Sequence, residues 1–459
     1  MIWLVGSSVL AIGVAWLVHL IYKWYNPKCN GVLPPGSMGL PFIGESLQLL
    51  EVGYSFDVIP FLRKRIRRYG PIFRTSVAGR PVVVSADPSF NHYIFQQDGK
   101  LFDTWYLDVF DKLFDKVGAA YNVAHIHKYI RITTISHFGL NALKDMLLPQ
   151  IVETMALDFG AKQLISYDPQ RSPVNLTDLY ASLLRGLMSF PLKIPGTPFH
   201  KCMKDRTKAM NFIREVLKQR LASPEKRQGD FLDHAIQDMN ANDFLTKEFI
   251  VQLFFGLMFV TYDAISTMTA LTLKLLDDSR DVLEELTVEH EAILKKREKP
   301  GSSITWDEYK SMAFTQHVIN EVLRLGNITP GLFRRTLTDI QVNGYTIPAG
   351  WPIMIVTSAL HLNSEIYNDP LDFNPSRWKD RKSNDMTKNF MPFGEGMKQC
   401  AGAEYTKVFM ASFLHVLVTK YRWNIIKGGG VCRNPFIGFG KGLHIKVTGK
   451  MITIKGISS

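Results

Sequence analysis

The segment that most constrains this chain runs from 389 to 402 and reads NFMPFGEGMKQCAG. Its glycines lead to a single cysteine, Cys400, and an apolar spacing typical of a helix follows through Tyr405, Phe409 and Val416. Glycine lets a backbone approach a flat, bulky group closely, and N–H groups at a helix N-terminus stabilise a thiolate. The segment therefore predicts a cysteine loop whose sulfur ligates a metal or acts as a nucleophile. A cysteine that simply fills a core is the plainer alternative.

The composition excludes several classes of protein. Of the 459 residues, 46% are hydrophobic and 12% aromatic, enough to bury a large core, so a disordered, collagen-like or coiled-coil chain is excluded. Four scattered cysteines are too few for a disulfide scaffold or a cysteine-rich zinc module. The formal net charge of +12 suits nucleic acid, an acidic membrane or an acidic protein partner, and composition does not choose among them.

The N-terminus predicts a membrane anchor. Residues 2–22 carry no acidic or basic side chain except His19, and Lys23, Trp24 and Tyr25 follow directly. At about 1.5 Å per residue this run can cross a bilayer core of roughly 30 Å. The aromatic and basic residues at its edge favour a cytosolic body. We expect an uncleaved transmembrane anchor over 1–22; a cleaved signal peptide or a buried helix is the alternative.

Behind this anchor, the chain is expected to form one body. Pro34-Pro35-Gly36 predicts a stiff, extended hinge over 23–39. Residues 72–77 and 81–85 have the composition of two short strands, helical patterns dominate from about 125 to 330, and strand patterns return at 340–347 and 443–454. The fold class is therefore mainly α with a small β-sheet region drawn from both ends of a single domain, 40–459.

One apolar stretch could be mistaken for a second membrane span. Between Phe249 and Leu273 the only charged side chain is Asp263. A carboxylate in the middle of a lipid-facing helix is costly, so we expect a long helix through the protein core. A buried acid needs either a hydrogen-bonding partner or a task.

The cysteine loop matches a longer pattern, Phe-x-x-Gly-x-basic-x-Cys-x-Gly, at Phe393, Gly396, Lys398, Cys400 and Gly402. In the same order along the chain, residues 321–324 read Glu-x-x-Arg and residues 373–378 read FNPSRW. Taken alone, Glu-x-x-Arg is a common helical ion pair. The three motifs together resemble the cytochrome P450 family, and with the anchor and hinge the resemblance covers nearly the whole chain.

The resemblance implies a haem b site. Cys400 would be the axial thiolate ligand of the haem iron, with Phe393 packed near its sulfur and Gly402 beside it. Glu321, Arg324 and Arg377 would form a buried triad that fixes the loop. The groups expected on the haem propionates are His127, Arg131, Arg334 and Lys398. A zinc pair at His125 and His127 is the alternative for that segment, but no further Cys/His cluster nearby completes it.

Three departures from the family pattern bear on activity. Lys398 replaces the usual arginine, which keeps the charge but loses the bidentate fork. On the long helix the acid is present as Asp263, whereas Ala264 stands where a threonine relays protons to dioxygen; Thr261, water or a substrate hydroxyl would substitute. The span between His137 and Lys201 is shorter than usual, as after altered splicing, so a helix could be missing within 138–200.

Three other segments resemble the plant branch of the family that oxidises sterols, triterpenoids and brassinosteroids. They are residues 32–45 (VLPPGSMGLPFIGE), 402–405 (GAEY) and 333–335 (FRR). The expected substrate is an apolar polycycle, and the aromatic and aliphatic segments expected around it suit such a molecule. The residues expected to contact it are Trp105, Phe255, Met258, Tyr262 and Leu332.

The resemblance implies a membrane-anchored monooxygenase of the endoplasmic reticulum, its catalytic body in the cytosol. Electrons would come from NADPH through NADPH–cytochrome P450 reductase, docked near Lys128, Lys388 and Lys407; no nucleic-acid partner is expected. A second hypothesis is a haem-thiolate isomerase or dehydratase of lipid hydroperoxides, which Ala264 suits but the compact spacing from Phe393 to Cys400 does not. A third is an inactive splice-type variant that serves as a non-catalytic membrane protein.

Overall fold

The computed structural model of this chain describes residues 2–41, 43–114, 124–138, 156–187, 189, 191–297, 302–379 and 389–450, with the backbone alone at 2–9, 111, 124–125, 137, 156–160 and 226. Helices make up most of this part of the chain, as predicted. They are α1 (Ile2–Tyr25), α2 (Ser46–Leu49), α3 (Pro60–Tyr69), α4 (Pro88–Gln96), α5 (Asp108–Phe114), α7 (Ala124–Phe138), α10 (Ala156–Ile165), α11 (Leu176–Leu187), α12 (Pro198–Ala222), α13 (Phe231–Asp238), α14 (Lys247–Asp278), α15 (Arg280–Lys296), α16 (Trp306–Ser311), α17 (Ala313–Gly326), α18 (Thr357–His361) and α20 (Ala403–Lys420).

The strands fall into a main sheet and three hairpins. The main sheet has the order β1-β2-β7-β4-β3, and the hairpins pair β5 with β6, β9 with β10, and β8 with β11. The strands are β1 (Ile72–Val77), β2 (Arg80–Ser85), β3 (Phe102–Thr104), β4 (Leu332–Thr336), β5 (Ile340–Val342), β6 (Tyr345–Ile347), β7 (Pro352–Ile355), β8 (Tyr421–Gly428), β9 (Val431–Asn434), β10 (Phe436–Phe439) and β11 (Leu443–Gly449).

The main sheet joins strands from the first quarter of the chain to strands between 332 and 355. The strands nearest the C-terminus, β8 to β11, form separate hairpins and are not part of this sheet, whereas the prediction of one sheet region from both ends had implied that they were. β1 and β2 form an antiparallel hairpin that turns at Ala78 and Gly79, both with positive φ, which matches the right-handed twist of the strands. β2 then pairs in parallel with β7, while β7 pairs antiparallel with β4 and β4 with β3. Residues before 105 and after 331 therefore share one sheet.

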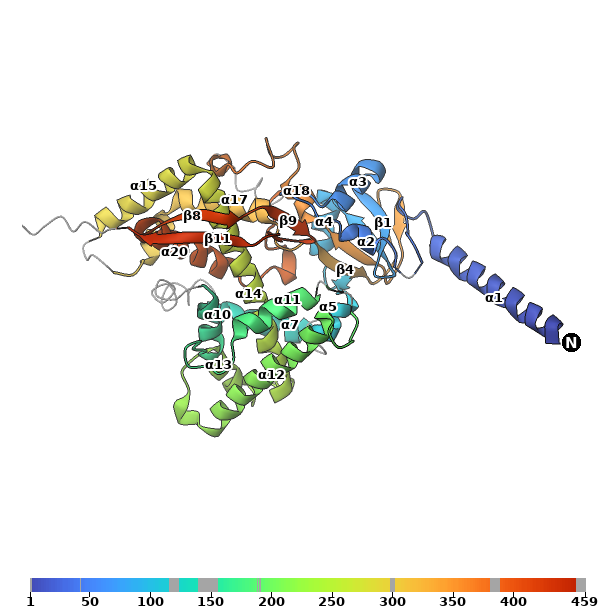
Figure 1. Cartoon of the computed structure of the whole chain (residues 1–459), viewed down its shortest axis with the longest axis horizontal. Helices are drawn as coiled ribbons and strands as arrows, with labels where there is room; N and C mark the ends of the chain where they lie inside the picture. Colours follow the sequence, from blue (N-terminus) through green and yellow to red (C-terminus); the bar gives the residue numbers. More distant parts are fainter. Residues whose placement is uncertain are drawn as a thin grey trace, which may run out of the picture.

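Alternation along these strands buries the sheet on both faces. Val83 and Ile353 lie in one hydrophobic cluster with Phe90 and Ile94 of α4, whereas their neighbours Val84 and Met354 lie in another with Phe61 and Leu62 of α3. Successive side chains of a strand point to opposite faces, so α4 covers one face of the sheet and α3 the other. Figure 1 shows this sheet region at the end of the body from which α1 projects.

The long helix α14 runs through the largest hydrophobic core. Thr246 caps its first turn by accepting a hydrogen bond from the N–H of Phe249. Phe254 and Leu276, more than six turns apart along it, are both fully buried. In the part of the chain described with side chains, α14 is the one helix long and apolar enough to cross a membrane. Its packing against α10, α12 and α17 agrees instead with the predicted core helix.

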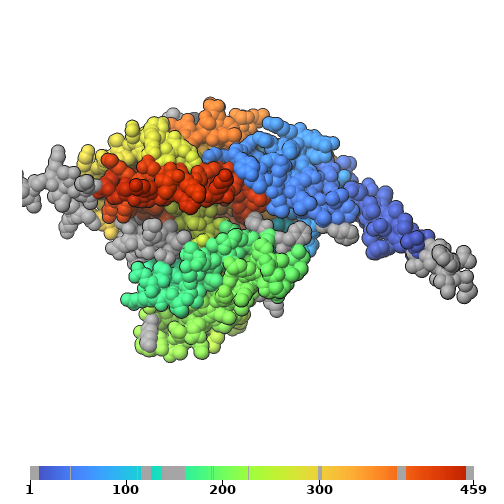
Figure 2. Space-filling model, viewed as in Figure 1, coloured from blue at the N-terminus to red at the C-terminus, as the bar shows by residue number. Residues whose placement is uncertain are grey.

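The molecule divides around α14. The helices α10 to α13 form a lobe on one side of α14, while α15, α17, α20 and the hairpin β8–β11 lie on the other (Figure 1). Figure 2 shows the same division at the surface, with α1 standing clear of the body. Along α1, apolar side chains such as Leu10 and Trp16 are well exposed. A row of exposed apolar residues of this kind marks an interaction surface.

Candidate active site

The predicted cysteine loop is a tight, hydrogen-bonded turn. The N–H of Cys400 donates to the carbonyl of Phe393 at 2.9 Å, and a short 3₁₀ turn, η4 (Gly396–Lys398), lies between them. Gly396 has φ +75°, and a Cβ there would lie 2.7 Å from the carbonyl oxygen of Phe95. Only glycine fits this close approach to the end of α4.

The Cys400 thiol is accessible although many protein atoms lie near it. Burial raises the pKa of the thiol, while the Gly402 N–H and the Arg131 guanidinium act in the opposite direction. The sulfur is therefore both accessible and close to enough protein atoms to disfavour its charged form. Helix α20 begins directly afterwards at Ala403, and a helix N-terminus favours the thiolate form.

Lys398 reaches from this loop to two carboxylates. Its Nζ lies 3.5 Å from Oδ1 of Asp98 and 3.4 Å from Oδ1 of Asp103, and it also donates to the hydroxyl of Thr104. Asp98 is fully buried and also pairs with Arg334 at 3.0 Å. Arg334 and Thr104 face each other across β3 and β4, so both lie on the sheet face that α4 covers.

Helix α7 brings two further predicted residues to the same place. Arg131 donates through Nη1 to the carbonyl of Gln399, directly before the cysteine. Burial lowers the pKa of His127, and the charges of Lys398 and Arg131 lower it further. His127 is therefore neutral near pH 7. The structure thus gathers the four residues predicted for haem propionates around one side of the Cys400 loop.

The predicted triad lies behind the loop as a buried ion network. The guanidinium of Arg324 donates two hydrogen bonds to the carboxylate of Glu321, at 2.9 and 2.8 Å, and the guanidinium of Arg377 donates a third at 2.8 Å. The indole N–H of Trp378 donates to the same carboxylate at 2.9 Å. Arg324 and Glu321 are completely buried, and Arg377 nearly so. Every oxygen of Glu321 is thereby satisfied, which a buried charge requires.

On α14, one face carries an exposed apolar residue. Val260 is 61% exposed although its neighbours Met258 and Phe259 are buried, and Ala264 lies one turn further along the same face. Burial raises the pKa of the Asp263 carboxyl. Among the residues that the structure describes, no side chain bonds that carboxylate. Thr261 turns its hydroxyl to the carbonyl of Leu257 at 2.8 Å, which places its oxygen along the helix.

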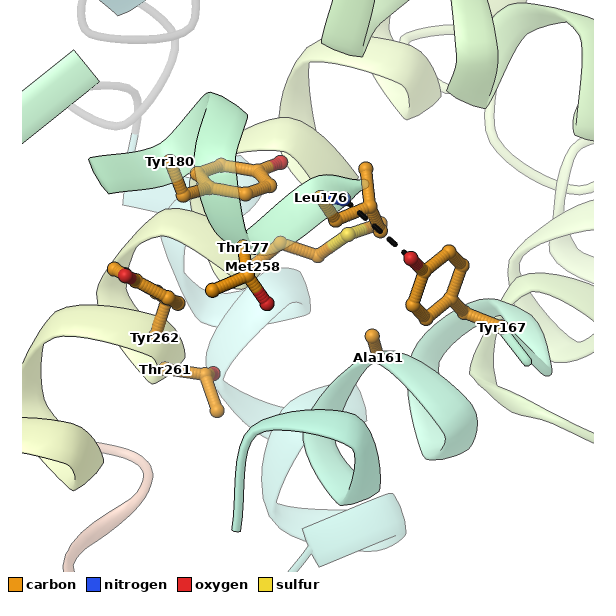
Figure 3. Close-up of a pocket in the computed structure, with 8 residues that line it drawn as sticks. All are labelled: Ala161, Tyr167, Leu176, Thr177, Tyr180, Met258, Thr261 and Tyr262. Atoms are coloured by element: carbon orange, nitrogen blue, oxygen red, sulfur yellow. Dashed lines mark hydrogen bonds between the residues drawn. The ribbon is translucent and has the colours of Figure 1, made fainter. Parts of the chain in front are cut away.

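Thr261 lines a small cavity between α14 and α11. The cavity measures about 20 Å³, room for one water. Figure 3 shows Thr261, Met258 and Tyr262 of α14 opposite Leu176, Thr177 and Tyr180 of α11, with Ala161 and Tyr167 closing the remaining side. Tyr167 accepts a hydrogen bond from the Leu176 N–H at 3.4 Å. Thr261 thus lies beside a space for one water, and Ala264 follows it three residues later on a neighbouring part of the α14 surface.

The five residues predicted around a substrate lie in different surroundings. Leu332 is close to the cysteine loop, because a Cβ on Gly394 would lie 3.5 Å from it. Trp105 packs edge-on against Phe333, the following residue of β4, whose side chain lies on the opposite face of the sheet. Phe255 is a core residue packed at a tilt against the rings of Phe114 and Tyr180. Met258 and Tyr262 line the small cavity of Figure 3.

Sequence reasoning missed the partners of the predicted residues. Asp98, Asp103 and Thr104 hold Lys398, and the buried His361 hydrogen-bonds the backbone of the loop at Met391. Aspartates at 98 and 103, just before and at a short strand, carried no signal of their own in the sequence. Of the predicted docking lysines, Lys128 is exposed, Lys407 lies 3.6 Å from Glu404, and Lys388 lies outside the described residues.

The comparisons with known proteins decide the family. The family model for cytochrome P450 matches residues 174–441, more than half of the chain. The beta-amyrin 16-alpha-hydroxylase of Maesa lanceolata is 48% identical, covering 98% of this chain and 99% of that protein. The cucurbitadienol 11-hydroxylase of Siraitia grosvenorii is 46% identical, covering 98% and 100%. This chain belongs to the cytochrome P450 family.

A solved structure agrees on the fold. A cyanobacterial cytochrome P450 with retinoic acid bound superposes with a TM-score of 0.79 at 22% identity, covering 92% of this chain and 100% of the other. The predicted cytochrome P450 fold, mainly helical with small sheets, is confirmed. The family and the fold imply haem iron, supplied with electrons from a nicotinamide cofactor through a reductase, and a monooxygenase activity.

The residues of this cytochrome P450 fit a haem. Three cations, Arg131, Arg334 and Lys398, face two carboxylates, Asp98 and Asp103, so positive charge is in excess where two acidic propionates would lie. The accessible thiol of Cys400 is a soft ligand suited to iron. The first relative aligns over 472 positions, although this chain has 459 residues, so it carries residues that this chain lacks. Residues 139–155 of the short region lie outside the described part of the chain.

Proposed function

We propose that this protein is a membrane-anchored haem-thiolate monooxygenase that hydroxylates a C–H bond of a triterpenoid or sterol. The observation that carries the chemistry is the accessible Cys400 thiol, set beside a cluster of cations inside the protein. The substrate class is supported by the names of the relatives, which include a beta-amyrin hydroxylase, a cucurbitadienol hydroxylase and a cholesterol 16,22-dihydroxylase.

In this proposal Cys400 would ligate the iron of haem b, which when bound would supply the reductive activation of dioxygen. Phe393 and Gly402 line the approach to the sulfur. Arg131, Arg334 and Lys398 bind the propionates, and the neutral His127 donates a hydrogen bond to one of them. Glu321, Arg324 and Arg377 are proposed to act only through structure, because their buried ion network fixes the loop.

Asp263 is proposed as the proton-holding group of α14. Its raised pKa keeps a larger share of the carboxyl protonated than in an exposed aspartate. Ala264 offers no hydroxyl to pass that proton on, so a water must do so. Thr261 is proposed to orient one in the small cavity of Figure 3. The contacts to substrate are proposed for Leu332 and Trp105, and less directly for Phe255, Met258 and Tyr262.

The proposed domain plan has an anchor at 1–22, a hinge at 23–39 and a catalytic body at 40–459. Helix α1 spans residues 2–25, about 36 Å at 1.5 Å per residue, which suffices for a bilayer core. Its exposed apolar side chains support an anchor in the endoplasmic reticulum membrane, with the body in the cytosol. NADPH–cytochrome P450 reductase would dock near Lys128, Lys388 and Lys407.

The first experiment tests the haem ligand. The carbon-monoxide difference spectrum of dithionite-reduced microsomes should show a red-shifted, thiolate-type Soret band, and Cys400→Ala should abolish this band while leaving the protein expressed. The absence of the band in well-expressed wild-type protein would reject the proposal in favour of a non-catalytic membrane protein.

The second experiment tests the reaction. Membranes with a plant reductase and NADPH are incubated with beta-amyrin, cucurbitadienol or cholesterol under ¹⁸O₂, and products are read by mass spectrometry. Incorporation of one labelled oxygen that requires NADPH supports a monooxygenase. Ala264 favours a second candidate, an isomerase or dehydratase of lipid hydroperoxides. Conversion of a hydroperoxide at the same rate without NADPH, and no labelled hydroxyl on any triterpene or sterol, would support that candidate instead.

A further inference from the structure

His361 lies at the end of α18 and is completely buried. Its ring has a partner on each side. Nδ1 lies 2.7 Å from Oδ1 of Asn327, and Nε2 lies 3.0 Å from the backbone N of Met391. Asn327 ends the helix that carries Glu321 and Arg324, whereas Met391 belongs to the cysteine loop. One imidazole therefore joins these two parts of the site.

The direction of both hydrogen bonds follows from the partners. A backbone N–H can only donate, so Nε2 of His361 accepts from Met391. The amide nitrogen of Asn327 already donates to the carbonyl of Arg324, so its oxygen faces the ring and accepts from Nδ1–H. The ring is thus a neutral imidazole with the proton on Nδ1. Burial, assisted by the charge of Arg324, lowers the pKa of His361 to about 3, which agrees with this form.

The Asn327 end of the link is rigid. Asn327 adopts a left-handed conformation, φ +38°, and its carbonyl accepts a hydrogen bond from Arg433 at 3.0 Å. Arg433 also donates to the carbonyls of Leu325 and Gly326, at 2.8 Å each. The end of α17 is therefore held from β9, and the carbonyl of His361 is held by Arg324 at 2.9 Å.

The Met391 end lies close to the reacting sulfur along the chain. Met391 is two residues before Phe393, whose carbonyl accepts the N–H of Cys400. Met391 also accepts the N–H of Gly394 at 3.1 Å. A second link holds the loop start, because the hydroxyl of Tyr367 donates to the carbonyl of Asn389 at 2.8 Å. Movement at Met391 would therefore be passed to the turn that holds Cys400.

We propose that His361 is a positioning residue for the Cys400 thiolate, acting through its hydrogen bond to the Met391 N–H. This inference rests on the proposed role of Cys400 as the haem ligand. Through its two hydrogen bonds, the imidazole fixes the start of the cysteine loop to the end of α17, which is itself held in place. Loss of its Nε2 acceptor frees the loop, and the thiolate is then released from iron more readily.

Two substitutions separate the two ring nitrogens. His361→Gln can place an amide oxygen where Nε2 lies and so keeps an acceptor for Met391, but it loses the donor to Asn327. His361→Asn keeps a donor at the position of Nδ1 and loses the acceptor for Met391. His290→Asn is the matched control, because His290 is an equally buried histidine bonded to His415 and Thr315 rather than to the loop.

The haem-loaded full chain is compared by amide hydrogen exchange over 389–400 and by the share of thiolate-type band in the carbon-monoxide spectrum. In His361→Asn, exchange at Met391 should rise roughly tenfold and the thiolate share should fall, as expected for one lost hydrogen bond. His361→Gln and His290→Asn should match the wild-type chain in both, even where their melting temperatures fall.

Three results would overturn the inference. One is a His361→Asn protein indistinguishable from His290→Asn in both measurements, and another is a His361→Gln protein that behaves like His361→Asn. The third needs no variant: a Met391 amide that exchanges in the wild-type chain as fast as an exposed amide. If the wild-type protein lacks the thiolate-type band, the proposed function fails, and the exchange measurements still decide whether His361 holds the loop.

Discussion

Lys398 stands where the cytochrome P450 pattern usually has arginine, and the structure gives its ammonium two carboxylates. Asp98 is fully buried, and Asp103 is partly buried. A point charge suits this arrangement, since it can face both acids without the planar geometry of a guanidinium. The departure from the family pattern is therefore accommodated by partners that lie far from it in the sequence.

Lys398→Met should lower the free energy of unfolding by about 1–3 kcal/mol, because it removes one of the two cations that pair with the buried Asp98 among the described residues. Haem content per protein should fall as well. Urea denaturation and the pyridine haemochrome assay check both. Lys398→Arg should stay close to the wild type, as should Lys100→Met at an exposed lysine; equal losses in all three would refute the prediction.

Gly396→Ala should lower the free energy of unfolding by about 1–3 kcal/mol and reduce haem retention. Its φ of +75° is strained for alanine, and the new Cβ would lie 2.7 Å from the carbonyl oxygen of Phe95. Thermal melts followed at the Soret band measure the effect. Gly438→Ala is the control, since a Cβ there meets nothing within 4 Å. A Gly396→Ala protein as stable as Gly438→Ala would contradict the geometry.

At the scale of elements, α17 is the support of the site. Its apolar face packs against α14 and α20, its middle carries Glu321 and Arg324, and its end is fixed by Arg433 and His361. The main sheet plays the corresponding part on the other side, because the pairing of β3 with β4 puts Thr104 and Arg334 on one face. Two rigid elements thus hold the cysteine loop from behind and from one side.

Glu321→Gln should be among the most damaging single substitutions, at about 3–5 kcal/mol, because it leaves Arg324 and Arg377 buried without their counter-charge. Expression level and guanidinium unfolding of whatever folds would measure it. The comparison is Glu285→Gln, whose pair with Lys379 at 3.2 Å is about half exposed and should contribute at most about 1 kcal/mol. Similar losses for the two would show that the triad is not a buried network.

At the scale of the whole molecule, two features act beyond the site. One is the set of buried neutral histidines, His290, His361 and His415, which lie on three helices around the loop and α17. Burial lowers their pKa values to about 3, 3 and 4. The other is α1, whose exposed apolar face stands clear of the body (Figure 2).

The histidines predict acid lability. Each of these histidines titrates near 6.5 in the unfolded chain. Below that pH the unfolded chain therefore binds more protons than the folded chain. The contribution of the three histidines to the free energy of unfolding is complete above pH 6.5 and is lost as the pH falls toward 4. The loss approaches about 1.4 kcal/mol per pH unit for each histidine. The free energy of unfolding, measured by urea titration from pH 7 to 5, should fall accordingly. His290→Asn should show a slope shallower by about one proton; an unchanged slope would reject this cause.

Removal of residues 1–25 should release the protein from membranes. The exposed apolar side chains of α1 form a surface suited to contact with lipid. Ultracentrifugation after carbonate extraction, with the full-length chain as control, should leave the intact protein in the pellet and move the truncated protein to the supernatant. A truncated protein that stays in the pellet after carbonate would mean that another surface is embedded.

The sequence by itself determined the parts of this protein whose chemistry is local. The Cys400 loop, the Glu-x-x-Arg pair, the strands at 72–85 and the core helix around Asp263 follow from spacing and residue type, because backbone geometry and periodicity are set by neighbours along the chain. That is also why the motifs were enough for the family and the fold class.

Only the tertiary structure decided how these parts are held. The Lys398 ammonium meets Asp103, 295 positions away, because β3 pairs with β4 and the loop closes over α4. His361 meets Met391 because α18 ends where α17 does. Such contacts depend on the packing of elements that are distant in sequence. The identity of a single aspartate or histidine does not indicate which residue will lie beside it in the folded protein.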